Sequence, residues 1–285
     1  MSTRSKVPAG FGLTGAARSM AELLEWIAKA VRHGFSEIQL HIQWSPILPN
    51  ELEAIERVLA SSRLRCRSIG IYNDLMLRDN PHFAGTTERD LRQIVDWMGA
   101  IQAESVVSWA GSYNDDLLGS DPRNSSREAR VLLTANLERL EPLLKKHRVR
   151  LLVEPWQTHV LAAEEELADF CAEHGASVGV VIDVANLVSP KEWQSRNERI
   201  DAIVTRLSPV CGLVHLKDMK VAADGSFELP YCGMGGIDFE RVLSRLQPLW
   251  RKVPFMIEHV SSDADISGAT GHVLSCAKNA GYDLA

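Results

Sequence analysis

Residues 178–183 read Val-Gly-Val-Val-Ile-Asp, an apolar run that ends on a carboxylate. Three further apolar runs lead into ionisable side chains: residues 150–154 (Arg-Leu-Leu-Val-Glu), 212–217 (Gly-Leu-Val-His-Leu-Lys) and 255–260 (Phe-Met-Ile-Glu-His-Val). Near-continuous aliphatic runs of this length are typical of parallel strands that are buried on both faces. We therefore predict a parallel sheet whose strands carry polar side chains at their carboxyl ends.

The alternation of strand and helix extends outward over the whole chain. The predicted strands span residues 11–14, 37–42, 65–72, 105–109, 150–154, 178–183, 212–217 and 255–260. The predicted helices follow them and begin near Ser19, Asn50, Thr86, Ser125, Ala162, Pro190, Asp238 and Gly268. Eight such units in 285 residues favour an α/β fold of the closed (β/α)₈ TIM barrel type.

An open doubly wound sheet is the alternative, and it would need a Gly-x-Gly-x-x-Gly turn after its first strand. The stretch Gly10-Phe-Gly-Leu-Thr-Gly15 lies on the predicted strand instead. Since no interior linker or low-complexity stretch divides the chain, we expect one domain over residues 1–285.

Charge and cysteine content narrow the class of protein. The chain has 31 Lys and Arg against 37 Asp and Glu, a net charge of −6, and its basic residues are scattered. This balance argues against binding to nucleic acid or to an anionic membrane. The five cysteines lie far apart without a Cys-x-x-Cys pair, and no apolar run approaches the ~20 residues that span a bilayer. The N-terminus also lacks the apolar core of a signal peptide, so we expect a cytoplasmic protein.

The polar residues at the strand ends predict a metal centre. In a barrel of this type, the active site lies at the carboxyl ends of the strands. Four consecutive predicted strands end on Glu154, Asp183, His215 and Glu258. Three carboxylates near one axis repel each other, and a divalent cation removes that repulsion. The mixed oxygen and imidazole set suits Mn²⁺, Mg²⁺, Co²⁺ or Zn²⁺ better than Ca²⁺.

Each of the four residues also has a structural interpretation when it is taken alone. Glu154 would then be an ordinary carboxylate at a strand end. Asp183 is placed to cap the turn that follows it, His215 to form a hydrogen bond in the core, and Glu258 to pair with a lysine. Four such coincidences at neighbouring strand ends are harder to explain than one metal site.

Five motifs carry a resemblance to a known family. They are Val153-Glu-Pro155, Ile182-Asp-x-x-Asn186, Val214-His-Leu-Lys-Asp218, Gly233-Met-Gly-Gly-Ile-Asp-Phe239 and Ile257-Glu258. With these motifs the sequence resembles the xylose isomerase-like TIM barrel superfamily, in particular its sugar phosphate isomerase/epimerase branch. The specific motifs lie within residues 150–260, and the His-x-Lys-Asp stretch followed by Gly-x-Gly-x-Ile-Asp is the most specific pair.

The resemblance implies a reaction and a cofactor. Glu154, Asp183, His215 and Glu258 would bind one divalent metal ion, with Mn²⁺ expected first, and Glu154 and Glu258 would be the acid/base pair. The chemistry is proton abstraction next to a carbonyl, through an enediolate, on a small sugar, sugar phosphate or keto-sugar derivative. A homodimer is a further expectation from the resemblance. The same intermediate also permits elimination, so a dehydratase or lyase of a keto-cyclitol or keto-glycoside remains the alternative.

The sequence departs from the family's ketose epimerases at two places. These enzymes usually carry His three residues after the metal-binding Asp, where this chain has Asn186, and Arg a few residues after the His of the seventh strand, where residues 219–221 read Met-Lys-Val. Lys217 shares a strand face with His215 and is expected either to contact a substrate oxygen or to form a salt bridge at the rim. A DNA-repair endonuclease of this superfamily needs further histidines, and Asn186 stands where one is expected.

Other residues are candidates for contact with the substrate. We expect His41, Asn186 and Lys217 to offer polar contacts, and Trp109 and Trp156 to form apolar walls, although each also suits the core. The Cys232-Gly-Met-Gly-Gly236 stretch follows the seventh strand, where many barrels bind phosphate. A tight turn before the next helix explains these glycines equally simply, so a phosphorylated substrate is not predicted.

Overall fold

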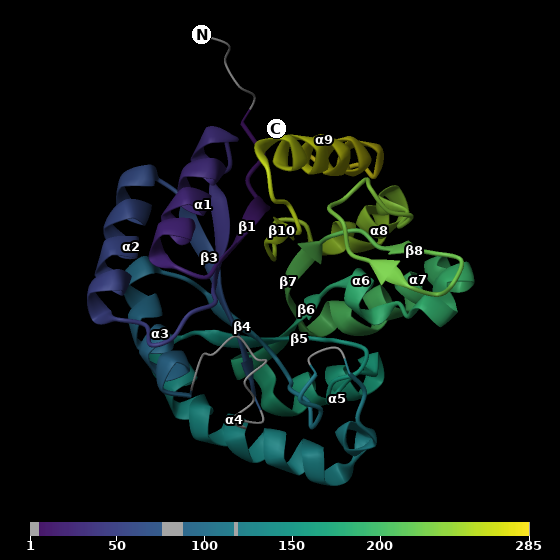
Figure 1. Cartoon of the computed structure of the whole chain (residues 1–285), viewed down its shortest axis with the longest axis horizontal. Helices are drawn as coiled ribbons and strands as arrows, with labels where there is room; N and C mark the ends of the chain where they lie inside the picture. The colour runs from purple at the N-terminus through teal and green to yellow at the C-terminus, as the bar shows by residue number, and fades with distance from the viewer. Residues whose placement is uncertain (1–5, 76–87, 117–118, 285) are drawn as a thin grey trace.

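The computed structural model describes residues 6–75, 88–116 and 119–284, and its centre is a closed barrel of parallel strands (Figure 1). Around the barrel the strands follow the order β1-β10-β7-β6-β5-β4-β3-β2. Every neighbouring pair is parallel, and the predicted (β/α)₈ TIM barrel is confirmed. The barrel strands are β1 (Phe11–Ala17), β2 (Glu37–Ile42), β3 (Arg65–Asp74), β4 (Ser105–Trp109), β5 (Arg150–Glu154), β6 (Val178–Ile182), β7 (Cys211–Leu216) and β10 (Phe255–Ile257).

Helices form a ring outside the barrel (Figure 1). They are α1 (Met20–Arg32), α2 (Pro49–Ser62), α3 (Glu88–Ile101), α4 (Arg127–His147), α5 (Glu164–His174), α6 (Val184–Leu187), α7 (Arg196–Leu207), α8 (Phe239–Leu246) and α9 (Asp263–Asn279). Short 3₁₀ segments lie at Pro122–Ser125, Gly175–Ser177, Pro190–Ser195, Ser208–Val210 and Gln247–Leu249.

Two apolar layers pack against the strands, one outside the barrel and one inside it. The larger layer lies between the barrel and its helices, and a small inner cluster consists of Tyr72, Val107, Leu152, Val181, Leu213 and Met256. Because side chains alternate along a strand, the residue two positions after an inner residue also points inward. This alternation places the carboxyl-terminal residues of β5, β6, β7 and β10 above the inner cluster, at one end of the barrel.

Several predicted boundaries are wrong by a few residues, and local hydrogen bonds explain why. The last helix begins at Asp263 instead of near Gly268, since the Ser262 side chain accepts from Asp265 N–H and the Asp265 carboxylate accepts from Ser262 N–H. This capping box starts the helix five residues earlier and leaves Gly268 inside it. The helix predicted from Ser125 is capped by Ser126, whose hydroxyl accepts from Ala129 N–H.

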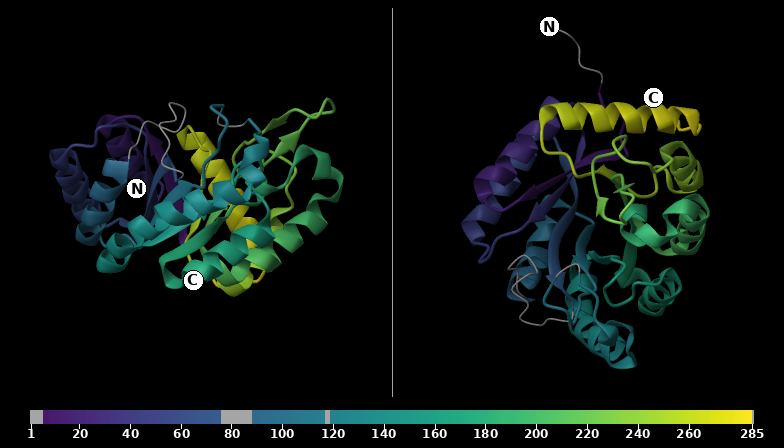
Figure 2. Two further views of the ribbon diagram at one scale, coloured as in Figure 1. Left: turned by 90° about the horizontal axis from the view of Figure 1, so that it is seen from below. Right: turned by 45° about the vertical axis from the view of Figure 1, so that its right-hand side comes forward.

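An antiparallel hairpin lies between β7 and α8, and the sequence did not predict it. Its strands are β8 (Lys220–Val221) and β9 (Phe227–Glu228), joined by a turn in which Gly225 has a φ of 84°. The positive φ suits glycine, which has no Cβ. Figure 2 shows the hairpin extending outward from the barrel. Its position after β7 puts it at the end where the polar strand termini lie.

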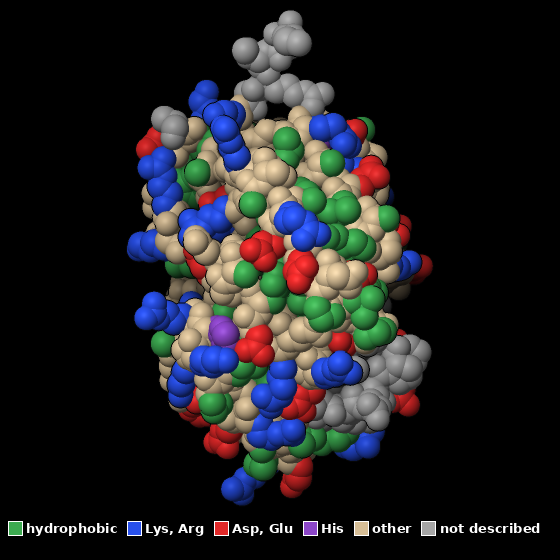
Figure 3. Space-filling view, turned by 90° about the vertical axis from the view of Figure 1, so that its left-hand side faces the viewer, with side chains coloured by type: hydrophobic (Ala, Val, Ile, Leu, Met, Phe, Trp, Pro, Cys, Tyr) green, Lys and Arg blue, Asp and Glu red, His purple; other side chains and the backbone are tan. Residues whose placement is uncertain are grey.

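The outer surface is mixed in charge on the side that carries α1 and α2. In the space-filling view of this side, Lys and Arg side chains alternate with Asp and Glu side chains and form no continuous basic stripe (Figure 3). Among the described residues, no helix is both long enough and apolar enough to cross a membrane.

Candidate active site

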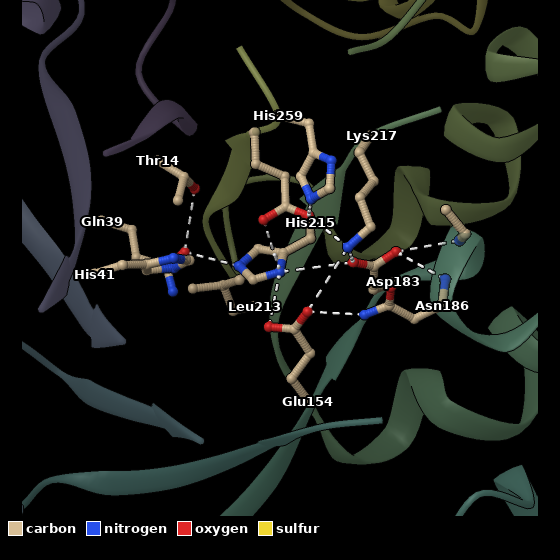
Figure 4. Close-up of polar contacts among 12 residues, drawn as sticks. Thr14, Gln39, His41, Glu154, Asp183, Asn186, Leu213, His215, Lys217 and His259 are labelled. Atoms are coloured by element: carbon tan, nitrogen blue, oxygen red, sulfur yellow. Dashed lines mark hydrogen bonds and ion pairs between the residues drawn. The ribbon is translucent and has the colours of Figure 1, made fainter. Parts of the chain in front are cut away.

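Four buried side chains from neighbouring strands converge at the carboxyl end of the barrel, and Figure 4 labels three of them, Glu154, Asp183 and His215. Glu154, Asp183, His215 and Glu258 each offer one ligand atom, and these atoms lie within 4.8 Å of one another. The Nδ1 atom of His215 is 3.2 Å from Glu154, 3.4 Å from Glu258 and 3.8 Å from Asp183. The structure therefore brings together all four residues that the sequence marked as metal ligands.

Lys217 reaches into the same cluster instead of lying at the outer rim. Its Nζ atom is 2.5 Å from Asp183 Oδ2, 2.7 Å from Glu258 Oε1 and 3.8 Å from Glu154 Oε1, and its side chain is only 4% exposed. The alternation of β7 explains this contact, because Leu213, His215 and Lys217 all point into the barrel. Two roles were predicted for Lys217, a contact with a substrate oxygen and a salt bridge. The salt bridge is present, and it is buried in the cluster.

A hydrogen bond fixes the orientation of the His215 ring. Its Nε2 atom lies 2.8 Å from Gln39 Oε1, an oxygen that only accepts. Nε2 therefore carries a proton, and the ring is turned so that Nδ1 faces the carboxylates. Metal-binding histidines are commonly oriented by a contact of this kind on the other ring nitrogen.

Asp183 serves two purposes at once. Its Oδ1 atom accepts from the backbone N–H groups of Ala185 and Asn186 and so caps α6, while its Oδ2 atom points to Lys217 and the centre of the cluster. The capping role and the site position are therefore both present in this one carboxylate.

Two neutral donors hold Glu154. Asn186 Nδ2 donates to Oε1 at 2.8 Å, and the Tyr72 hydroxyl donates to Oε2 at 2.5 Å. The Tyr72 oxygen is also 3.1 Å from His41 Nε2. Asn186 and His41 therefore lie next to the cluster, with Asn186 bonded directly to one of its carboxylates.

Burial and neighbouring charges shift the acid–base properties of the cluster strongly. Burial disfavours the charged form of His215, but Glu258 and Glu154 outweigh it and raise the pKa of His215 to about 10. Burial also opposes the charge of Lys217, and the carboxylates of Asp183, Glu258 and Glu154 raise its pKa above the usual value. In the other direction, burial favours protonation of Asp183, and the Lys217 charge overcomes that effect and lowers the Asp183 pKa.

The remaining groups respond to the same charges. Burial again favours protonation of Glu154, and His215 and Lys217 together lower its pKa below the usual value. Burial, helped by the positive charge of His215, lowers the pKa of His41 to about 3, so this imidazole is neutral. Burial and the Glu154 and Glu258 charges raise the pKa of Tyr72 well above its usual value, which keeps its hydroxyl a donor.

The donor set fits a divalent cation. Three carboxylates and one lysine leave a net charge of −2 when His215 is neutral, and a divalent ion balances this charge. The mixture of hard carboxylate oxygens and one imidazole nitrogen suits Mn²⁺, Mg²⁺, Co²⁺ or Zn²⁺. A cluster of four such groups, all buried, is costly unless a cation compensates it.

A cavity of about 830 Å³ opens above the cluster. Its lining includes the predicted contact residues His41, Asn186, Lys217, Trp109 and Trp156, together with Glu154 and Glu258. The structure therefore places all five predicted contact residues at one cavity that leads to the carboxylates.

Comparison with known proteins agrees with this arrangement. A sequence model of the family described as "Xylose isomerase-like TIM barrel" matches residues 27–278. The chain belongs to this family. Among curated proteins, no sequence matches significantly.

Solved structures of the xylose isomerase-like family resemble this chain over nearly its whole length. A D-allulose 3-epimerase from Methylomonas sp. has a TM-score of 0.68 at 18% identity, covering 96% of this chain and 98% of its own. A xylose isomerase-like TIM barrel protein from Mycobacterium smegmatis in complex with magnesium has a TM-score of 0.68 at 16% identity, covering 98% and 99%. A 3-keto-D-glucoside 4-epimerase from E. coli has a TM-score of 0.67 at 12% identity, covering 94% and 99%. Identities this low establish a common fold alone.

Sequence reasoning missed Tyr72 and Gln39 as parts of this xylose isomerase-like site. Tyr72 is the last residue of the predicted strand 65–72, so reading the end of that strand as well would have found it. Its backbone φ of 40° is rare outside glycine. Gln39 lies in the middle of β2, where its buried amide contacts His215 and the Thr14 hydroxyl. A polar residue in the middle of a strand carries no sequence signal of this role.

The glycine-rich loop after β7 is a turn, as expected, and not an open anion site. The Asp218 carboxylate accepts from the backbone N–H groups of Gly233, Gly235 and Ile237 at 2.9–3.0 Å. The two intervening N–H groups, those of Met234 and Gly236, donate to the carbonyl oxygens of Tyr231 and Met219. Every backbone N–H from residue 233 to residue 237 is thus used within the protein.

Proposed function

We propose that this protein is a divalent-metal-dependent isomerase or epimerase that acts on a small sugar or keto-sugar derivative. The observation that carries the proposal is the buried cluster of three carboxylates and one imidazole beneath a cavity of sugar-binding size. The proposed ligands of the metal are Glu154, Asp183, His215 and Glu258, with Mn²⁺ the first choice. Three of these residues also lie within reach of the Lys217 ammonium.

The proposed reaction removes a proton from the carbon next to a carbonyl. A bound divalent cation supplies Lewis-acid stabilisation of the negative charge that develops on the carbonyl oxygen. Glu154 and Glu258 come from β5 and β10, which are separated in the barrel by β6 and β7. The two carboxylates thus reach the cluster from different sides of the barrel, and we propose that one removes the proton and the other returns one.

The surrounding residues support the two glutamates in different ways. Glu154 accepts from Asn186 and Tyr72, and these bonds fix the direction of its carboxylate. Glu258 pairs with Lys217 and lines the cavity. We propose that His41, Asn186 and Lys217 contact substrate oxygens, and that Trp109 and Trp156 form apolar walls beside the substrate.

Proton exchange with solvent tests the proposal. The protein is incubated in deuterated water with ketoses and keto-glycosides and with Mn²⁺, Mg²⁺ or Co²⁺, and deuterium incorporation is followed by NMR. We expect incorporation next to the carbonyl with the native protein and its loss in Glu154→Gln and in Glu258→Gln. The matched control is Glu104→Gln, a half-exposed carboxylate just before β4, at the opposite end of the barrel.

The products separate the proposed reaction from the alternative. A new stereoisomer or a ketose–aldose pair identifies epimerisation or isomerisation, whereas loss of water or of an alcohol identifies the dehydratase or lyase reaction. If both glutamine variants exchange as fast as the native protein, the acid/base assignment is refuted.

Since all five cysteines are free thiols, the structure also suits the reducing compartment that we propose for this protein, the cytoplasm.

A further inference from the structure

The cavity above the carboxylates has an aromatic wall that three separate segments build. Trp109 ends β4 and pairs in register with Glu154, Trp156 follows β5, and Phe227 lies on β9 of the hairpin. The rings of Trp156 and Phe227 are 6.5 Å apart, and Tyr72 packs on Trp109 with ring centroids 4.8 Å apart. Since Tyr72 also bonds to Glu154, the wall continues directly from the carboxylate cluster into the cavity.

The described lining offers no uncommitted cation to an anionic substrate. Lys217 is the only lysine or arginine among the cavity-lining residues in the described ranges, and its ammonium already contacts three carboxylates. An anionic group that enters the cavity also meets the carboxylates of Glu154 and Glu258. A divalent ion at the proposed site would balance the −2 charge of the cluster without leaving an excess of positive charge, so the described lining does not favour phosphate.

The loop that binds phosphate in many barrels is already filled by a carboxylate of the protein. Asp218 accepts from three N–H groups of residues 233–237, and backbone carbonyls accept from the other two. A phosphate would have to displace Asp218 to use these donors, and the buried carboxylate would lose three of its four backbone N–H partners and keep only that of Met219.

The cavity has room for a ligand larger than one sugar ring. Its volume of about 830 Å³ lies in the upper part of the range of roughly 300–1,000 Å³ that encloses drug-sized ligands. A sugar ring placed at the carboxylates leaves the space beside Trp109, Trp156 and Phe227 for a second group. Flat aromatic surfaces bind another aromatic group more favourably than they bind water.

From these four observations we propose that the substrate is an uncharged keto-sugar derivative that carries an aryl group, and not a sugar phosphate. The aryl group packs against Trp109, Trp156 and Phe227 while the sugar carbonyl faces the carboxylates. The position of the carbonyl rests on the proposed function, whereas the preference for an aryl group rests on the wall alone.

Binding without reaction tests the preference directly. Phenyl β-D-glucoside and methyl β-D-glucoside differ only in the second group, and neither can enolise because neither contains a ketone. We expect isothermal titration calorimetry on the Mn²⁺-loaded protein to show phenyl β-D-glucoside binding about tenfold tighter, a factor typical of one or two aromatic contacts. Glucose 6-phosphate should bind more weakly than methyl β-D-glucoside.

The variant Phe227→Ala shows whether the wall is responsible. Phe227 is half-buried on a surface hairpin, so its loss leaves the barrel intact, which circular dichroism verifies. We expect the phenyl-to-methyl affinity ratio to fall roughly three- to tenfold, with methyl β-D-glucoside binding unchanged. The matched control is Met234→Ala, an apolar residue that is 55% exposed and is absent from the cavity lining.

The outcomes separate this proposal from the proposed function. Equal binding of the two glucosides, tightest binding of glucose 6-phosphate, or no binding of either glucoside would overturn the aryl preference. Deuterium exchange on free ketoses would then still support the isomerase or epimerase function. Conversely, the native protein could prefer the phenyl glucoside and lose that preference in Phe227→Ala, while no keto-sugar exchanges deuterium. This result would support the aromatic wall as an aryl-binding surface and refute the proposed proton-transfer reaction.

Discussion

Replacing Lys217 by methionine should destabilise the metal-free protein and make it more responsive to metal. The substitution keeps the length and apolar stem of the side chain but removes an ammonium that lies 2.5 Å from Asp183 and 2.7 Å from Glu258. Both carboxylates are at most 5% exposed, so the surrounding water cannot replace the lost charge. His215 is then the only group left in the cluster that can carry a positive charge.

The expected loss follows from the burial of these pairs. Removing one partner of a buried ion pair costs roughly 3–5 kcal/mol. For a large domain each kcal/mol corresponds to roughly 2–4 °C in Tm, so the metal-free variant should melt roughly 6–20 °C below the native protein. The site charge also changes from −2 to −3 with neutral His215, so a divalent cation should bind the variant more tightly and restore most of the lost Tm.

Thermal unfolding in EDTA and in Mn²⁺ measures both effects. The matched control is Lys220→Met, an exposed lysine three residues further along the chain on β8, which should change Tm little in either buffer. If Lys217→Met melts with the native protein in EDTA, the ammonium does not stabilise the cluster. A smaller Mn²⁺-induced rise in the variant than in the native protein would refute the electrostatic reasoning.

Three further predictions follow from neighbouring contacts. Tyr72→Phe removes the hydroxyl that donates to Glu154, and it should slow deuterium exchange roughly tenfold with little change in KM, which a kinetic comparison with the native protein checks. Gln39→Leu removes the acceptor that orients His215, and it should weaken Mn²⁺ binding roughly 10- to 100-fold in a calorimetric titration. Hydrogen-bond donors at the start of α9, the Ser261 hydroxyl first, lower the pKa of Asp265 to about 2, which is below its value in the unfolded chain. The ionised carboxylate therefore stabilises the folded protein above about pH 4, and this stabilisation is lost as the pH falls towards 2. Asp265→Ala should therefore lower the free energy of unfolding by roughly 0.5–2 kcal/mol at pH 6, the cost of one lost cap, and by less in acid. Thermal unfolding at several pH values checks this, and a Tm difference from the native protein that does not change with pH would contradict the assignment.

The barrel and its four strand-end residues could be predicted because both depend on local alternation. An inward-pointing apolar residue fixes the direction of the residue two positions later, as Leu213 does for His215 and then Lys217. Contacts between distant strands have no such signal, which is why Gln39 on β2 was missed as the partner of His215 on β7. The β8–β9 hairpin was missed for another reason, since strands of two residues are too short to show a period.

The His-x-Lys-Asp motif has a physical explanation in the two directions that side chains take at the end of β7. His215 and Lys217 point inward and set the charge of the carboxylate cluster, while Asp218 points the other way and holds the loop of residues 233–237. A Cβ at position 235 would overlap the Asp218 carboxylate, so this loop needs glycine where the carboxylate approaches it. The pairing of His-x-Lys-Asp with Gly-x-Gly-x-Ile-Asp some fifteen residues later is therefore one structural unit. Its first half supplies charge to the site, and its second half closes the loop around the aspartate, so a change in either half should disturb the other.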